Sequence, residues 1–149
     1  MSSPTPHRPL RILLVDDDPV FRELIAFVLR ADVGAEIVGQ AFDGAEGVEL
    51  AQELNPDIVI MDLRMPGVDG FEATRQIAAT VPDARVIVVS SSKEREDIER
   101  AGRAGAAAYV PKDRAVAELS DAVGQLRPAQ AETKRRSLSL FFVRRLVLS

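Results

Sequence analysis

The sequence predicts an α/β fold in which helices cover both faces of a parallel sheet of five strands. Between residues 10 and 126, five apolar segments alternate with segments of helical periodicity. Several of the apolar segments are rich in valine and isoleucine and show no polar alternation, which is typical of strands buried on both faces. Alternating strands and helices of this kind form an open, doubly wound sheet with right-handed crossovers.

The strands are predicted where the apolar segments lie, at residues 10–15, 35–40, 57–62, 84–90 and 106–110. The first helix is predicted to begin after Asp18, and its inward face is predicted to consist of Leu24, Ile25, Val28 and Leu29. The last helix carries one apolar stripe at spacings of three and four residues, which is typical of a helix packed on a core. Its members are Val116, Leu119, Val123 and Leu126.

Short polar residues mark the predicted helix starts. Asp18 precedes Pro19, and proline is well tolerated as the first helical residue because its missing N–H would have no intrahelical partner. Three further starts have the spacing of a capping box, with the pairs Asp43 and Glu46, Asp69 and Glu72, and Ser91 and Glu94. Asp113 is predicted to cap the last helix. We therefore interpret Asp18 as a structural residue.

Acidic side chains follow two of the predicted strands, at the edge where ligands bind in sheets of this kind. Asp16 and Asp17 come directly after the first strand, and Asp62 ends the third. Like charges about 4 Å apart repel by roughly 1 kcal/mol even in water, so these carboxylates need a cation to hold them together. A set of carboxylates without histidine or cysteine favours Mg²⁺, which takes one or two carboxylates and keeps several waters.

A hydroxyl and an amine follow two other strands at the same edge. Ser90 ends the fourth strand, and Lys112 comes after the fifth. Such groups can contact the oxygens of a phosphoryl group, and a carboxylate can itself be the nucleophile that forms an aspartyl-phosphate. Together with the acidic cluster, they predict phosphoryl chemistry at this edge of the sheet.

Four segments of the sequence resemble the receiver domain of bacterial two-component response regulators: LLVDDDP, VIMDLRMPGVDG, VIVVSSS and AAAYVPKD. The resemblance covers residues 9–127. It implies a flavodoxin-like (βα)5 fold with strand order 2-1-3-4-5, and a phosphorelay signalling protein rather than an enzyme that turns over an external metabolite. The segment MDLRMPGVDG is most similar to receivers that are usually joined to a helix-turn-helix output domain.

The resemblance implies a role for each acidic residue. Asp62 would be the phosphoacceptor, which takes a phosphoryl group from a sensor histidine kinase, a phosphotransfer protein or a small phosphodonor. Asp17, Asp62 and the backbone carbonyl of Arg64 would ligate Mg²⁺, and Asp16 would hold a metal-bound water.

The resemblance also implies how the remaining residues respond to phosphorylation. Lys112 and Ser90 would contact the phosphoryl oxygens, and Tyr109 would be the aromatic residue whose rotamer follows Ser90. Three positions depart from the commoner pattern of the family. Ser90 stands where threonine is more frequent, Pro111 removes a backbone donor beside Lys112, and Arg64 occupies a position that tunes the lifetime of the phosphoryl group.

Two other interpretations of the same residues stay open. Asp16, Asp18 and Val20 also fit the D-x-D-x-V pattern of haloacid-dehalogenase phosphatases, with Asp16 as the nucleophile and Asp18 as the acid/base. That interpretation leaves Asp62 without a role. The chain could instead be a phosphate-independent binding module, although no acidic residue or lysine of the motif is missing.

Composition restricts the class of protein. The chain has no cysteine, which excludes a disulfide framework and a thiolate metal site, and its only histidine, His7, lies in a predicted disordered arm of residues 1–8. That arm has no apolar core, so it is neither a signal peptide nor a membrane span, and we expect a cytoplasmic location. The net charge of −4 reflects an acidic body, which argues against nucleic-acid binding there.

Residues 128–149 are predicted to form a basic and apolar tail that is too short for a helix-turn-helix domain and for a membrane span. We therefore expect a stand-alone receiver that acts through a downstream protein partner. The alternative is the receiver portion of a truncated DNA-binding transcription regulator. We expect the tail to dock on the domain or to form a homodimer. Alternatively, the tail binds a membrane surface or is a remnant of a linker without a role.

Overall fold

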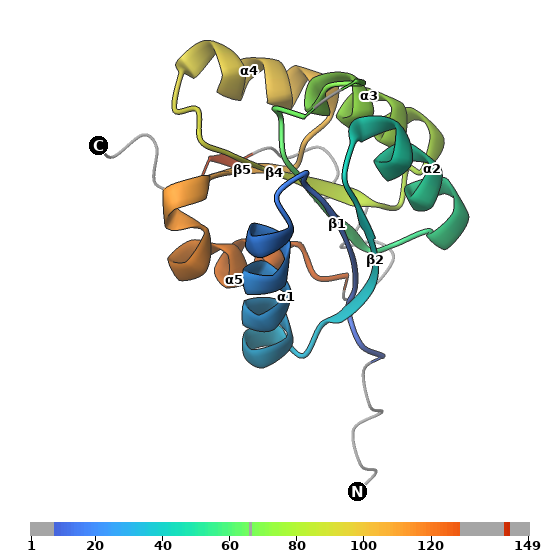
Figure 1. Cartoon of the computed structure of the whole chain (residues 1–149), viewed down its shortest axis with the longest axis vertical. Coiled ribbons are helices and arrows are strands. Elements are labelled where there is room, and N and C mark those ends of the chain that lie inside the picture. Colours follow the sequence, from blue (N-terminus) through green and yellow to red (C-terminus); the bar gives the residue numbers. More distant parts are fainter. Residues whose placement is uncertain (1–7, 66, 129–141, 144–149) are drawn as a thin grey trace, which may run out of the picture.

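The strands of the protein form one parallel sheet in the order β2-β1-β3-β4-β5-β6 (Figure 1). The computed structural model describes residues 8–65, 67–128 and 142–143. The strands are β1 (Arg11–Val15), β2 (Glu36–Ala41), β3 (Ile58–Met61), β4 (Arg85–Ser90), β5 (Ala108–Pro111) and β6 (Phe142–Val143). The predicted order of the first five strands is confirmed, and each lies within two residues of its predicted bounds.

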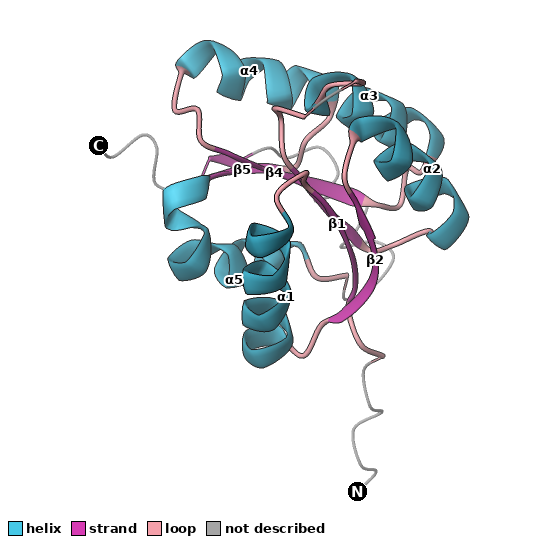
Figure 2. Cartoon of the chain, in the orientation of Figure 1, coloured by secondary structure: helices cyan, strands magenta, loops and turns pink. Residues whose placement is uncertain are grey.

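Helices cover both faces of this sheet, as predicted (Figures 1 and 2). One face carries α1 (Pro19–Val33) and α5 (Ala115–Leu126), which pack against each other. The other face carries α2 (Gly44–Leu54), α3 (Gly70–Thr80) and α4 (Arg95–Ala104). The resulting three layers leave the carboxyl ends of the strands open at one edge, where the loops that follow them lie.

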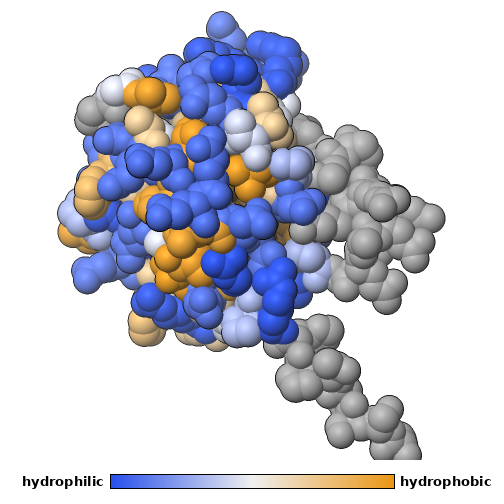
Figure 3. Space-filling model, turned by 90° about the vertical axis from the view of Figure 1, so that its right-hand side faces the viewer, coloured by the Kyte–Doolittle hydropathy of each residue, from blue (hydrophilic) through white to orange (hydrophobic). Residues whose placement is uncertain are grey.

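Alternate residues of the central strands enter two separate cores. In β1, Ile12 and Leu14 pack in a cluster with Ile25 and Leu29 of α1. Leu13 of β1 points the other way and belongs to the cluster under α2 and α3. This arrangement explains why the strands lack polar alternation. Because these apolar side chains are buried, the face seen in Figure 3 consists mostly of hydrophilic residues, with small hydrophobic patches between them.

Two residues of the predicted inward faces lie outside the core. Leu24 is 44% exposed and Val116 is 53% exposed. The buried face of α1 is centred on Ile25, Ala26 and Leu29, and successive helical residues point about 100° apart, so Leu24 lies at the outer edge of that face. At the start of α5, the buried Ala115 takes the core position predicted for Val116.

Three of the five predicted helix caps are confirmed. The carboxylates that accept backbone N–H groups at the starts of α1, α2 and α3 belong to Asp18, Asp43 and Asp69. The other two predictions are wrong. α4 begins after Glu94, which makes no side-chain cap bond, so Ser91 is not the cap residue of this helix. A short 3₁₀ turn precedes α5, and Asp113 in that turn pairs with Lys93 at 2.8 Å.

Both ends of the folded body extend beyond the prediction. Arg8 falls in the predicted disordered arm, but its guanidinium donates to both carboxylate oxygens of Asp57, at 2.9 and 2.7 Å. At the other end, β6 adds a sixth strand beside β5, with Phe142 opposite Ala108. The rest of the predicted arm, with His7, and most of the predicted tail lie outside the described residues.

Gly70 packs against the backbone that carries Asp62. A Cβ at Gly70 would overlap the carbonyl oxygen of Asp62 and lie 2.6 Å from the Cα of Leu63. We expect Gly70→Ala to lower the free energy of unfolding by about 1–3 kcal/mol, as overpacking does. Gly124→Ala is the control, since a Cβ there meets nothing within 4 Å, and it should raise stability by about 0.5–1 kcal/mol. Urea unfolding measures both, and equal effects would contradict the packing argument.

Candidate functional site

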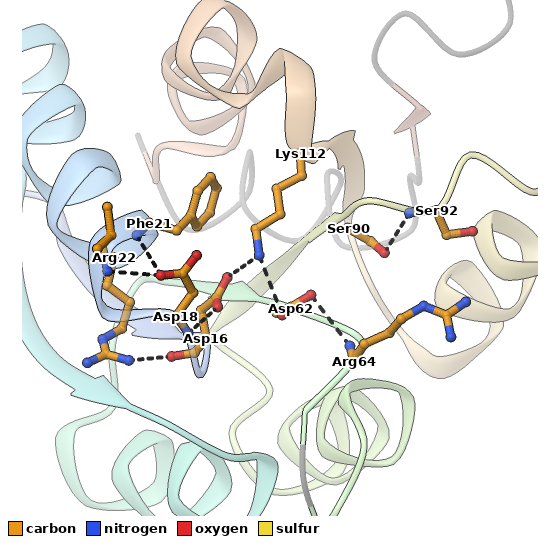
Figure 4. A network of polar contacts seen from close by, with 10 residues as sticks. Asp16, Asp18, Phe21, Arg22, Asp62, Arg64, Ser90, Ser92 and Lys112 are labelled. Atoms are coloured by element: carbon orange, nitrogen blue, oxygen red, sulfur yellow. Dashed lines mark hydrogen bonds and ion pairs between the residues drawn. The ribbon is translucent and has the colours of Figure 1, made fainter.

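The loops after β1, β3 and β5 bring the amine of Lys112 together with the carboxylates of Asp16 and Asp62 (Figure 4). The Nζ of Lys112 lies 3.0 Å from Oδ2 of Asp16 and 3.7 Å from Oδ2 of Asp62. Carboxylate oxygens of Asp16, Asp17 and Asp62 lie within 4.8 Å of one another. The strand-end arrangement predicted from the sequence therefore exists, because parallel strands place their carboxyl ends at one edge.

The three consecutive aspartates have different surroundings. Asp16 is buried; one of its oxygens accepts the N–H of Asp18 at 2.8 Å and the other pairs with Lys112. Asp17 is exposed at the rim of the site. Asp18 turns its carboxylate to the first turn of α1, where it accepts the N–H groups of Val20 and Phe21. The structural interpretation of Asp18 is therefore confirmed.

Two residues that were not predicted from the sequence hold this loop in place. Arg22 of α1 donates to the backbone oxygen of Asp16 at 2.5 Å and to the side chain of Gln40 at 3.0 Å. The ring of Phe21 lies 4.5 Å from the Nζ of Lys112, a distance at which an aromatic face attracts a cation. Both residues belong to the first turn of α1, so the helix start positions the acidic loop.

Burial and charge shift the protonation equilibria of the two central groups. Burial is the largest cause that raises the pKa of Asp62 to about 6; the charge of Asp16 adds to it, while Lys112 and the N–H of Arg64 oppose it. Burial acts to lower the pKa of Lys112, but the hydrogen bond to Asp16 and the charge of Asp62 outweigh burial and raise that pKa. The lysine therefore stays charged beside Asp62.

Ser90 and Tyr109 lie on neighbouring strands beside this cluster. Ser90 is fully buried at the end of β4, and its Oγ accepts the N–H of Ser92 at 3.1 Å. Tyr109 is also buried, and its hydroxyl donates to the backbone oxygen of Ser92 at 2.7 Å. Burial raises the pKa of Tyr109. Both predicted switch residues are thus linked to Ser92, a residue that was not predicted from the sequence.

Arg64 leaves the site on the side opposite Asp16 (Figure 4). Its N–H donates to Oδ1 of Asp62 at 3.4 Å, while its guanidinium lies 3.6 Å from a carboxylate oxygen of Asp97 in α4. Arg64 and Asp97 both line an open hollow of about 510 Å³, and its lining also includes Asp17 and Arg100. No sequence pattern pointed to Asp97, because an acidic residue in a first helical turn is common on dipole grounds alone.

The three carboxylates fit a hard divalent cation. All donors of the cluster are oxygen atoms, the class of ligand that Mg²⁺ prefers, and within the described ranges this is the one acidic group of its kind. Among the described helices, none is long and apolar enough to cross a bilayer.

Comparisons with known proteins agree with this geometry. Residues 12–124 match the family described as response regulator receiver domain. The chain is 42% identical over 114 residues to the transcriptional regulatory protein LiaR of Bacillus subtilis, a match that covers 76% of this chain and 54% of LiaR. It is 50% identical over 107 residues to a protein-glutamate methylesterase/protein-glutamine glutaminase of Myxococcus xanthus, covering 70% of this chain and 30% of that protein.

A solved structure is similar over most of its length. The LuxR-family two-component response regulator from an Aurantimonas species has a TM-score of 0.76 and 34% identity, with 89% of this chain and 96% of that chain covered. The chain spans about half the length, or less, of the two curated relatives.

Proposed function

This chain belongs to the family of response regulator receiver domains, and from that premise we propose that it accepts a phosphoryl group on Asp62. The observation that carries the proposal is the position of Asp62, within 3.7 Å of Lys112 inside a cluster of three carboxylates. In the reaction, a carboxylate oxygen of Asp62 attacks phosphorus. A new O–P bond forms, and the bond to the donor's nitrogen or oxygen breaks with its electron pair on the donor.

Mg²⁺ would be held by Asp17, Asp62 and the backbone carbonyl of Arg64. Asp16 would not ligate it directly, since both of its oxygens already have partners in the protein; it would orient a water instead. When bound, Mg²⁺ supplies positive charge that offsets the carboxylates and the phosphoryl oxygens. The exposed position of Asp17 at the rim leaves it free to turn towards the metal.

Lys112 and Ser90 would recognise the phosphoryl group after transfer. Lys112 can shift its amine from Asp62 to a phosphoryl oxygen without leaving Asp16, because it already lies close to both. The Ser90 hydroxyl would turn its hydrogen to another phosphoryl oxygen. Tyr109 would respond through Ser92, whose backbone contacts both residues. A phosphoryl group adds about −1.5 to −2 charges, so the state that pairs with it better gains population.

The phosphoryl donor would be a sensor histidine kinase or a phosphotransfer protein, and the phosphorylated state would bind a downstream protein. An exposed apolar stripe on α1 supports such contacts: Val20 is 72% exposed and Phe27 is 71% exposed. The stripe begins at the helix turn beside Asp16. We propose a cytoplasmic receiver, with a homodimer as one form of the active state.

We also propose that the chain turns over no external metabolite. The methylesterase relative is named for an enzymatic activity, but this chain covers only 30% of that protein. The candidate site of this chain is the acidic cluster at the strand ends, which suits a phosphoacceptor. Nucleic-acid binding by the receiver body is not expected either, because its charge is acidic overall.

The test is intact mass after treatment with acetyl phosphate, with and without Mg²⁺. We expect the protein to gain the mass of one phosphoryl group only with Mg²⁺, and Asp62→Ala to gain none. Label that persists in Asp62→Ala and disappears in Asp16→Ala would instead indicate a phosphatase of the haloacid-dehalogenase type. If the wild type stays unlabelled where a control receiver is labelled, the phosphate-independent binding module replaces the proposal.

A further inference from the structure

A chain of polar contacts runs from the phosphoacceptor loop to Tyr109 through α4. The guanidinium of Arg64 lies 3.6 Å from Oδ2 of Asp97. The same oxygen accepts the hydroxyl of Ser92 at 2.6 Å. The backbone oxygen of Ser92 accepts the hydroxyl of Tyr109 at 2.7 Å. Arg64 follows Asp62 by two residues, so this chain connects the residue that receives the phosphoryl group to the buried aromatic.

Ser92 is the centre of these contacts. Its N–H donates to Oγ of Ser90, and its own Oγ accepts the N–H of Glu94 at 3.2 Å while donating to Asp97. Glu94 makes no side-chain cap bond, and the contacts of Ser92 with Glu94 and Asp97 tie the start of α4 to the loop after β4. A change in the charge around Asp97 therefore acts on the loop that also holds Ser90 and Tyr109.

The Arg64–Asp97 ion pair is weak, so a stronger anion nearby can take the Arg64 guanidinium from Asp97. The Arg64 side chain is 72% exposed, and its contact with Asp97 is a single long ion pair, a kind of pair that contributes little in water. A phosphoryl group on Asp62 would offer three oxygens and more charge than one carboxylate. Guanidinium groups bind such anions through two parallel hydrogen bonds. The backbone N–H of Arg64 already donates to Asp62.

We propose that Arg64 is a charge-operated latch on the loop after β4, an inference that rests on the proposed phosphorylation of Asp62. In the unphosphorylated protein, Arg64 and the hydroxyl of Ser92 share one oxygen of Asp97. Phosphorylation draws the guanidinium to the phosphoryl oxygens, so Asp97 loses its counter-ion. Asp97 then accepts the hydroxyl of Ser92 more strongly, which tightens the loop whose backbone oxygen holds the hydroxyl of Tyr109. Arg64 is thus a positioning residue that transmits charge at Asp62 to the aromatic switch.

The chain contains one tyrosine and no tryptophan, so its intrinsic fluorescence comes from Tyr109 alone. We would record that emission while intact mass gives the labelled fraction of the same sample, with acetyl phosphate and Mg²⁺ as the phosphodonor mixture. Dividing the emission change by the labelled fraction separates switching from any change in labelling rate or phosphoryl lifetime.

Arg64→Ala, Asp97→Asn and the double variant form a double-mutant cycle that tests whether the two residues act through one contact. Arg100→Ala is the matched control, since Arg100 lines the same hollow and stacks on Phe71 at 4.0 Å.

We expect the normalised emission change to fall at least two-fold in Arg64→Ala and in Asp97→Asn. The double variant should be no more impaired than either single variant, because both act through one contact, and Arg100→Ala should behave as the wild type. Full emission change in labelled Arg64→Ala, or additive losses in the double variant, would overturn the latch. So would a labelled wild type without any emission change. An unlabelled wild type is a different result, because it would overturn the proposed function itself.

Discussion

Replacing Lys112 with alanine is expected to slow the phosphorylation of Asp62 by acetyl phosphate by about a hundred-fold or more. Lys112 provides the amine that lies beside both Asp16 and Asp62. Removing it leaves the developing charge on the phosphoryl oxygens without that partner, and the loss of one such donor typically costs about 10²–10³ in rate. The rate of mass gain at fixed Mg²⁺ measures the effect.

The same substitution should leave Mg²⁺ affinity unchanged or raise it. Lys112 competes with the metal for the same carboxylates, so its removal makes the cluster more negative. Lys93→Ala is the matched control, because Lys93 is an exposed lysine that pairs with Asp113 at 2.8 Å. If Lys112→Ala is phosphorylated slowly but still binds Mg²⁺, the role of Lys112 is to contact the phosphoryl group. A rate within a few-fold of the wild type would remove Lys112 from the mechanism.

Most of the fold could be predicted because burial on both faces leaves a local signature in the strands. Segments such as residues 84–90 carry consecutive valine and isoleucine, and β4 is buried at every position. Strand order came from the resemblance, since no local pattern encodes which strands are neighbours. β6 escaped prediction because its two residues have no turn or periodic signal of their own and are defined only by pairing with β5.

The candidate site was predictable to the extent that position along the chain determines position in space. Asp16, Asp62 and Lys112 each follow a strand, and parallel strands bring these points together whatever the side chains are. The Arg64–Asp97–Ser92 contacts were not predictable, because they join a loop to the side of a helix more than thirty residues away. Nothing in the spacing of the three residues indicates that they meet.

Asp62→Asn is expected to stabilise the metal-free protein in a strongly pH-dependent way. The pKa of Asp62 in the folded state is about 6, well above its ordinary range, chiefly because the carboxyl is buried. The folded state therefore binds this proton more tightly than the unfolded state. The stabilisation of the wild type by that proton is complete below about pH 4 and is lost as the pH rises through 6. Asparagine has no charge to bury.

The difference in the free energy of unfolding between Asp62→Asn and the wild type should thus be small near pH 4 and grow to about 3 kcal/mol by pH 8. Urea unfolding in EDTA at several pH values measures it. Adding Mg²⁺ at pH 8 should stabilise the wild type more than the variant and narrow the gap, because the asparagine side chain of the variant offers no charge to the metal site.

Asp113→Asn is the matched control for this titration. The hydrogen bond from Lys93 is the main cause that lowers the pKa of Asp113, so the ionised carboxylate of Asp113 stabilises the folded state. Replacing it with asparagine should slightly destabilise the protein at neutral pH, the opposite direction from Asp62→Asn. A stability difference for Asp62→Asn that stays constant between pH 4 and 8 would mean that Asp62 ionises as freely as an exposed carboxylate. In that case burial would not set its charge, and the cluster would be wetter than the packing around Asp16 and Asp62 indicates.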